Sequence, residues 1–105
     1  KMVVHEGFYD VINCHQHGIK NAVGIITVTN YFSDWMIKFL IENQIKVVLG
    51  LDNDETGKKN SFRLKQQLDN NHIRNEIKQI VLSDCKDADD ILKKYGSDCY
   101  IRTYL

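Results

Sequence analysis

The sequence predicts an α/β domain built on a four-stranded, mainly parallel sheet with helices on both faces. Short apolar runs alternate with segments of helical spacing four times along the 105 residues, and no proline, linker or repeat interrupts the pattern. The third run, KVVLGL at residues 46–51, is apolar on both faces, as a central parallel strand requires. Such alternation gives parallel strands joined by right-handed crossovers, so we expect one domain over residues 1–105.

The first predicted strand and helix lie at the start of the chain. Residues 2–5 are a short apolar run of strand type, and residues 8–17 have helical spacing up to Gly18, which favours a left-handed stop. Residues 22–28 then form the second predicted strand. These segments give the first β–α unit and the beginning of the next.

The second predicted helix begins after Ser33 and runs to about Asn43. Ser33 is a favoured N-cap residue, and Phe32 and Ile37 have the spacing of a hydrophobic staple. The large apolar side chains of this helix are expected to face the core rather than to stack on nucleic-acid bases: Trp35, Phe39 and Leu40.

The second half of the chain repeats the pattern. The strand at residues 46–51 is followed by a polar helix at 55–71, a fourth strand at 76–82 and a short helix at 88–95 that ends at Gly96. In the polar helix, the residues expected to face the core are Phe62, Leu64 and Leu68. In a parallel sheet of this kind, ligands bind outside the carboxyl ends of the strands.

Composition and charge leave the class of partner open. Hydrophobic residues make up 43% and charged residues 27% of the chain, and the formal net charge is zero, which neither indicates nor excludes a nucleic-acid partner. The three cysteines form no C-x-x-C pair, so neither a disulfide framework nor a zinc site is indicated. A reduced, intracellular setting fits this cysteine usage.

The sequence predicts a cytoplasmic protein without a membrane partner. No apolar run approaches the roughly 20 residues that span a bilayer, and the first residues lack the features of a secretory signal. Neither end has a polar tail, from which we expect a domain cut from a longer protein.

Acidic residues gather after three of the four predicted strands. They follow the first, third and fourth strands, whereas the turn after the second strand has none: Glu6 and Asp10; Asp52 and Asp54; Asp87, Asp89 and Asp90. For these groups to share one site, the first, third and fourth strands must be neighbours. The predicted strand order is therefore 2-1-3-4, with the switch point between the first and third strands.

This acidic group predicts a metal site. Like charges in a partly dry cleft raise one another's pKa, and a divalent cation such as magnesium, which binds carboxylate and phosphate oxygens, removes that penalty. Asp52 and Asp54, at alternate positions where a strand enters its turn, can point to one side, and Gly57 permits a tight turn into the next helix. A single aspartate more often caps a helix or fills a turn, but the whole set favours a metal.

The string DNDETG at residues 52–57 also fits two other motifs. It matches the start of an EF-hand calcium loop, but Arg63 occupies the twelfth position, where calcium needs a bidentate glutamate, and a strand rather than a helix precedes Asp52. It also fits the D-x-D-x-T motif of haloacid-dehalogenase-type phosphatases, with Asp52 as the nucleophile. That family places the motif after its first strand, whereas two predicted strands precede it here.

Four segments together resemble the successive motifs of a known family. VVHEGFYDVI, NAV, LGLDNDETGKK and KDADDIL look like the motifs of the Toprim domain, and most closely the version in DnaG-type bacterial primases. The resemblance covers nearly the whole chain and implies the Toprim-like three-layer fold. Two departures, Ala88 in place of proline and an altered turn between Val23 and Ser33, favour a divergent relative from a mobile element.

The resemblance also implies roles for the acidic residues. The Toprim glutamate, thought to be the general acid/base of phosphotransfer, corresponds to Glu6. The D-x-D pair that holds Mg²⁺ (or Mn²⁺) corresponds to Asp52 and Asp54. The additional acids of primases correspond to Asp10, Asp87 and Asp89.

The small and basic residues beside these motifs are candidates for phosphate contact. Gly7, directly after Glu6, lets backbone approach a phosphate. The basic residues either form a solvated face or contact phosphate with the help of a helix N-terminus: Lys58, Lys59, Arg63, Lys65 and Lys86. His5, before Glu6, is expected to be packed or hydrogen-bonded rather than catalytic.

The leading functional hypothesis is the magnesium-dependent catalytic domain of a DnaG-like primase, a nucleotidyltransferase that makes RNA primers. Its partners would be nucleoside triphosphates, a single-stranded DNA template bound through the parent protein, and a replicative helicase; the isolated domain is expected to be nearly inactive. The alternatives are a Toprim nuclease, in which water replaces the 3′-hydroxyl, and a non-catalytic interaction module. The residues alone do not decide between polymerisation and hydrolysis.

Overall fold

The computed structural model describes residues 1–24 and 31–105 and contains one parallel sheet. In chain order its elements are β1 (Met2–His5), α1 (Phe8–Gln16), β2 (Ala22–Gly24), α2 (Asp34–Glu42), β3 (Val47–Leu49), α3 (Glu55–Asn70), β4 (Asn75–Ile77), α4 (Ala88–Tyr95) and α5 (Ser97–Tyr104). The strands pair in the order β2-β1-β3-β4, and every pairing is parallel. The predicted fold class and strand order are confirmed.

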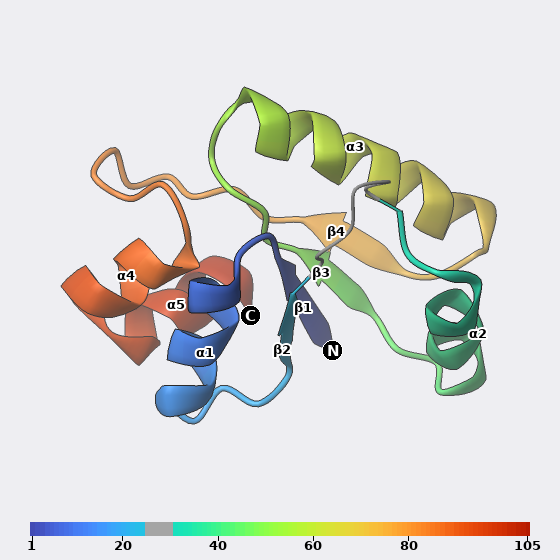
Figure 1. Cartoon of the computed structure of the whole chain (residues 1–105), viewed down its shortest axis with the longest axis horizontal. Helices are drawn as coiled ribbons and strands as arrows, with labels where there is room; N and C mark the ends of the chain where they lie inside the picture. The colour runs from blue at the N-terminus through green and yellow to red at the C-terminus, as the bar shows by residue number, and fades with distance from the viewer. Residues whose placement is uncertain (25–30) are drawn as a thin grey trace.

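Helices cover both faces of the sheet, which gives the predicted three layers. Helices α1, α4 and α5 lie on one side of the strands, and α2 and α3 lie on the other (Figure 1). Successive residues of β1 point to opposite faces, so Val3 packs in the core under α1, α4 and α5 while Val4 packs against α2 and α3. In the described residues, no helix combines the length and apolar character that crossing a bilayer requires.

Local signals fix several element ends where the sequence predicts them. The Ser33 hydroxyl accepts a hydrogen bond from the Met36 N–H at 3.4 Å and caps α2, and Phe32 and Ile37 are buried in the same cluster. Gly18 ends the first β–α unit at a φ of 80°, a left-handed conformation that glycine adopts without steric cost.

Three aromatic residues predicted to face the core are exposed instead. Trp35 is 67% exposed, Phe39 41% and Phe62 60%. Residues on a helix are separated by about 100°, so Trp35 and Phe39 lie on the side of α2 opposite the buried Ile37, and Phe62 lies about 200° from the buried Leu64. The helical phase set by the aliphatic residues therefore determines which side of each helix is buried.

The fourth strand is shorter than predicted, and a helix follows the last predicted one. Pairing of β4 with β3 ends at the Leu49–Ile77 pair, after which Ile80 leaves the sheet edge and packs into the core under α4 and α5. Helix α5 was not predicted; it begins directly after Gly96. The predicted extension of the second strand over residues 25–28, and most of the altered turn that follows it, lie outside the described residues.

Candidate metal centre

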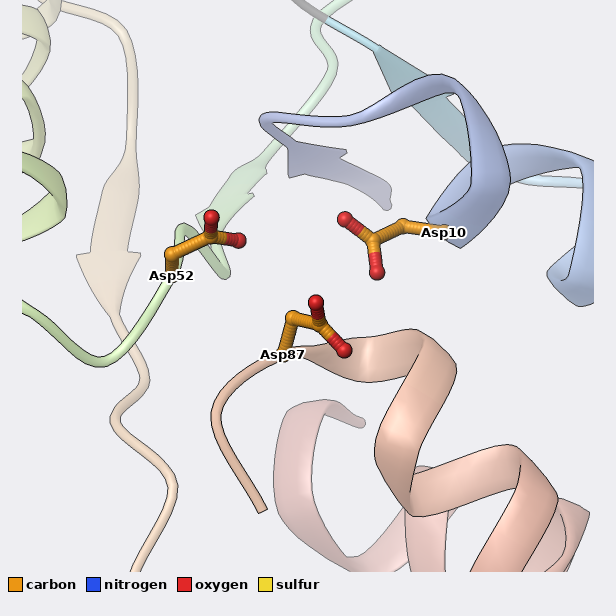
Figure 2. A group of neighbouring side chains, drawn as sticks. All are labelled: Asp10, Asp52 and Asp87. Carbon is orange, nitrogen blue, oxygen red and sulfur yellow. The ribbon is translucent and has the colours of Figure 1, made fainter.

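Three aspartates from distant parts of the chain meet beyond the carboxyl ends of β1 and β3. Asp10 lies in the first turn of α1, Asp52 follows β3, and Asp87 is the N-cap of α4. One carboxylate oxygen from each lies within 4.8 Å of those of the other two, and the three side chains point toward a common space (Figure 2). We call these three residues the acidic trio.

Hydrogen bonds to backbone N–H groups orient two members of the trio. Asp10 Oδ1 accepts from the Asp89 N–H at 2.8 Å, which joins the beginning of α1 to the beginning of α4, and Asp10 Oδ2 accepts from the Gly7 N–H at 3.3 Å. Asp87 Oδ1 accepts from the Asp90 N–H at 2.9 Å as a helix cap. Capping and participation in the trio are therefore combined in Asp87.

The turn that contains Asp52 is held from both sides. A Cβ atom on Gly57 would lie 2.0 Å from the Asp52 carbonyl oxygen, so only glycine permits this close approach. The Asp54 carboxylate caps α3 by accepting from the Gly57 N–H at 2.7 Å. The Asn53 N–H donates to the Lys86 carbonyl at 2.8 Å, which ties the turn to the segment that precedes Asp87.

Burial and mutual repulsion raise the pKa values of two trio members. Burial, followed by the negative charges of Glu6, Asp10, Asp87 and Asp54, raises the pKa of Asp52 to about 7. Burial also raises the pKa of Asp10 to about 6, with the Asp89 N–H opposing the shift and the charge of Asp87 adding to it. Without a counter-charge, Asp10 and Asp52 therefore retain protons at pH values where ordinary aspartates have lost them.

Glu6 lies beside the trio with an unsatisfied oxygen. Its Oε1 is buried and has no hydrogen-bond partner in the described part of the chain. Burial and then the charge of Asp54 raise the pKa of Glu6, while Lys86 and the neighbouring Asn60 lower it. An unpaired, buried carboxylate oxygen next to three further carboxylates provides the hard oxygen donors that Mg²⁺ or Mn²⁺ binds, so these residues fit a divalent cation.

The other predicted acidic ligands lie around the trio rather than in it. Asp54 is engaged as the cap of α3, and its Oδ2 lies 3.6 Å from Lys86 Nζ. Asp89 accepts from Asn13 Nδ2 at 2.8 Å and forms an ion pair with Lys93 at 2.8 Å. The structure therefore groups Asp10 with Asp52, whereas the sequence groups Asp54 with Asp52.

The candidate phosphate contacts differ in their surroundings. Lys86 lies at the edge of the site through its ion pair with Asp54. Three basic residues of α3 are exposed: Lys58, Lys59 and Arg63. The N–H of Gly7 is directed to Asp10, and a Cβ atom at this position would lie 3.1 Å from Asp10 Oδ2, so the absence of a side chain at Gly7 makes room for that carboxylate.

Two further buried polar residues near the site, His5 and Asn60, make contacts that the sequence did not indicate. His5 is fully buried and hydrogen-bonded, as predicted, but its partner Tyr100 lies on the unpredicted helix α5. Asn60 is buried on α3 next to Glu6. The available signal for Asn60 is its position: a polar residue three positions after Gly57, on the face of α3 that also holds Leu64.

Comparison with known proteins identifies the family. The family model described as Toprim-like matches residues 3–92, and the chain belongs to this family. The DNA primase of Clostridium acetobutylicum is 30% identical over 101 residues, which are 96% of this chain but 16% of that protein. The chain therefore spans about a sixth of the length of this curated relative.

Solved primase structures share the fold. A DNA primase domain from Pseudomonas aeruginosa superposes with a TM-score of 0.74 at 25% identity, over 97% of this chain and 32% of that one. The Aquifex aeolicus primase, in a structure of its zinc-binding and RNA polymerase domains, gives a TM-score of 0.76 at 22% identity over 97% of this chain and 24% of that one. The resemblance to the Toprim domain of DnaG-type primases is thus confirmed.

Proposed function

We propose that this chain is the metal-dependent catalytic domain of a DnaG-like DNA primase, which extends an RNA primer by nucleotidyl transfer. The observation on which the proposal depends most is the acidic trio, whose carboxylate oxygens lie within 4.8 Å of one another at the carboxyl edge of the sheet. The similarity of the chain to DNA primases supports the choice of reaction. The chain covers only 16% of the Clostridium acetobutylicum DNA primase, so the primase activity is proposed for the longer parent protein that contains this domain.

The acidic trio would hold Mg²⁺ or Mn²⁺, with Asp54 and Asp89 beside it. When bound, the ion supplies positive charge to the triphosphate and makes the attacking hydroxyl more acidic. The chain's part is to fix the carboxylates in advance: backbone N–H groups orient Asp10 and Asp87, and Gly57 allows the turn that directs Asp52. Protons retained by Asp10 and Asp52 would be released when the cation binds.

Glu6 would accept the proton of the primer 3′-hydroxyl. Its pKa is raised by burial and by the charge of Asp54, which makes the carboxylate a stronger base than an exposed glutamate. Its Oε1 is buried and has no hydrogen-bond partner in residues 1–24 and 31–105, so this atom has unused capacity to accept a hydrogen bond. The raised pKa and the unpaired oxygen of Glu6 support the proposed role as general base.

Basic residues would bind the substrates. Lys86 lies at the edge of the acidic site, and Lys58, Lys59 and Arg63 extend from the exposed side of α3; in the proposal they contact the triphosphate and the nucleic acid. Gly7 would keep the backbone beside Glu6 accessible to phosphate. A single-stranded DNA template and a replicative helicase would be bound through the rest of the parent protein.

The proposal is tested by primer synthesis with the parent protein. Glu6→Gln is expected to reduce metal-dependent incorporation of labelled ribonucleotides on single-stranded DNA by roughly 100-fold or more, the usual contribution of a general base. The control is Glu55→Gln, an exposed acid in the first turn of α3, which should retain the wild-type rate. Near-normal synthesis by the Glu6 variant would refute its role, and degradation of the DNA without primer synthesis would identify a nuclease instead.

A further inference from the structure

The His5 side chain joins three elements beneath the acidic site. It is fully buried, and its Nδ1 lies 2.6 Å from the carbonyl oxygen of Gly50 while its Nε2 lies 2.6 Å from the hydroxyl of Tyr100. A carbonyl only accepts, so Nδ1 carries the hydrogen and donates to Gly50; in the neutral ring Nε2 then accepts from the Tyr100 hydroxyl. Burial lowers the pKa of His5 to about 4, which is consistent with a neutral ring.

These two hydrogen bonds lie at the carboxyl ends of β1 and β3, directly before the acidic residues that follow these strands. His5 directly precedes Glu6, and Gly50 is two residues before Asp52. Backbone pairing between β1 and β3 ends with the Gly50 N–H donating to the Val4 carbonyl at 2.8 Å. The His5 imidazole then binds the carbonyl of the same Gly50, so a side chain adds one more bond between the strands after the backbone ladder has ended.

Helix α5 packs two tyrosines against the His5 ring. Tyr100 and Tyr104, one turn apart, are both fully buried, and both rings meet the His5 ring edge to face, with centroids 5.6 and 5.0 Å away. Tyr104 also packs directly on Gly50, where a Cβ atom would lie 2.6 Å from its ring. These tyrosines lie beyond residues 3–92, the part of the chain that matches the family model.

We propose that His5 and Tyr100 are positioning residues that hold the end of β1 against the end of β3 and thereby set the placement of Glu6 relative to Asp52. The two hydrogen bonds are buried, so water does not compete for their donors and acceptors as it does for groups in the partly exposed turns that follow the strands. The functional part of this inference rests on the proposed metal centre.

The two tyrosines provide a matched pair of variants. Both are buried on α5 against the same imidazole, but only the Tyr100 hydroxyl binds His5; that of Tyr104 has no hydrogen-bond partner in the described residues. Tyr100→Phe should therefore weaken Mn²⁺ binding, measured by calorimetry, roughly three- to tenfold, the effect of losing one net hydrogen bond. Tyr104→Phe should leave the affinity unchanged. Equal affinities for the two variants would overturn the proposal.

A second measurement separates this inference from the metal centre itself. Amide hydrogen exchange at Gly50 reports its bond to Val4 without any metal, and should become several-fold faster in Tyr100→Phe but not in Tyr104→Phe. If wild-type protein binds no Mn²⁺ while exchange changes as expected, the metal assignment fails and the positioning role stands. If the wild type binds Mn²⁺ and the two variants exchange alike, the positioning role fails.

A double variant distinguishes loss of positioning from a general loss of stability. Tyr100→Phe leaves His5 Nε2 buried and unpaired, which can unfold the domain. His5→Leu with Tyr100→Phe removes that nitrogen as well and leaves the Gly50 carbonyl as the group that loses its donor, so the double variant is expected to remain folded. A positioning role predicts that this folded double variant still binds Mn²⁺ weakly and still exchanges Gly50 fast. Recovery of wild-type affinity together with stability would show that the pair matters for packing alone.

Discussion

Replacing Asp52 with asparagine should stabilise the metal-free domain at pH 8 and do so by a smaller amount at pH 5. The folded-state pKa of Asp52 is raised to about 7 from an ordinary value of 3.8, so the folded state holds a proton that the unfolded chain has already released. The stability that this proton gives is present at low pH and is lost as the pH rises from about 4 through 7. At pH 8 Asp52 is charged and repels its neighbours, and Asp52→Asn removes that repulsion.

The size of the stabilisation expected at pH 8 follows from the distances between the carboxylates of the trio. Two unit charges 4.8 Å apart repel by about 3 kcal/mol at an effective dielectric constant of ~20. Asp52 is only half-buried, so solvent and salt reduce the net effect to about 1–2 kcal/mol. Since the asparagine side chain offers no charged ligand, the same variant should bind Mn²⁺ at least about tenfold more weakly.

The assay is urea unfolding at pH 5 and pH 8 in buffer with a chelator, in which the midpoint moves with the free energy of unfolding. The matched control is Asp98→Asn, an exposed acid in the first turn of α5, which should show no difference between the two pH values. An equal change in the stability of the Asp52 variant at both pH values would mean that the carboxylates do not repel one another, and the electrostatic reasoning would be wrong.

Three further predictions concern the turn at Gly57, the side-chain bonds of Gln67 and the pH dependence of metal binding. Gly57→Ala places a Cβ atom 2.0 Å from the Asp52 carbonyl, so it should cost about 2–3 kcal/mol in chemical unfolding and weaken metal binding; wild-type stability would contradict the described turn. Gln67→Ala removes both side-chain bonds to the Phe32 backbone, at 2.8 and 2.9 Å, and should cost about 1–2 kcal/mol, whereas the exposed neighbour Gln66→Ala should cost almost nothing. Mn²⁺ affinity should rise from pH 5 to pH 8, because binding displaces protons from Asp10 and Asp52; calorimetry in buffers of different ionisation enthalpy should detect their release, and a flat pH profile would contradict the raised pKa values.

The strand order was predictable because it follows from chemistry as well as pattern. Carboxylates after the first, third and fourth strands can share one cation only if those strands are neighbours, and the sheet has that order. The burial of whole helix faces was less predictable. Trp35 and Phe62 have the larger apolar side chains, yet the positions of Ile37 and Leu64 set the phase of their helices and leave both aromatic side chains mostly exposed.

The membership of the acidic trio depends on contacts that local sequence does not encode. The D-x-D spacing favours Asp52 with Asp54, but both oxygens of Asp54 have other partners: Oδ1 accepts from the Gly57 N–H, and Oδ2 lies 3.6 Å from Lys86 Nζ. Asp10 joins Asp52 instead, because the Asp89 N–H holds its carboxylate across a separation of 79 residues. The role of α5 was hidden for the same reason: Tyr100 meets His5 across 95 residues, and no periodicity within either segment indicates the contact.

The central claim, that Asp10, Asp52 and Asp87 converge to hold one divalent cation, is tested most directly by paramagnetic NMR. Mn²⁺ added in small amounts to isotopically labelled protein should first broaden the signals of these three residues and of Glu6, and replacing Asp10 with asparagine should remove that selectivity. Residues of the exposed side of α2, on the other face of the sheet, should broaden last. Uniform broadening across the surface, or none near the trio at concentrations that saturate a specific site, would contradict the account.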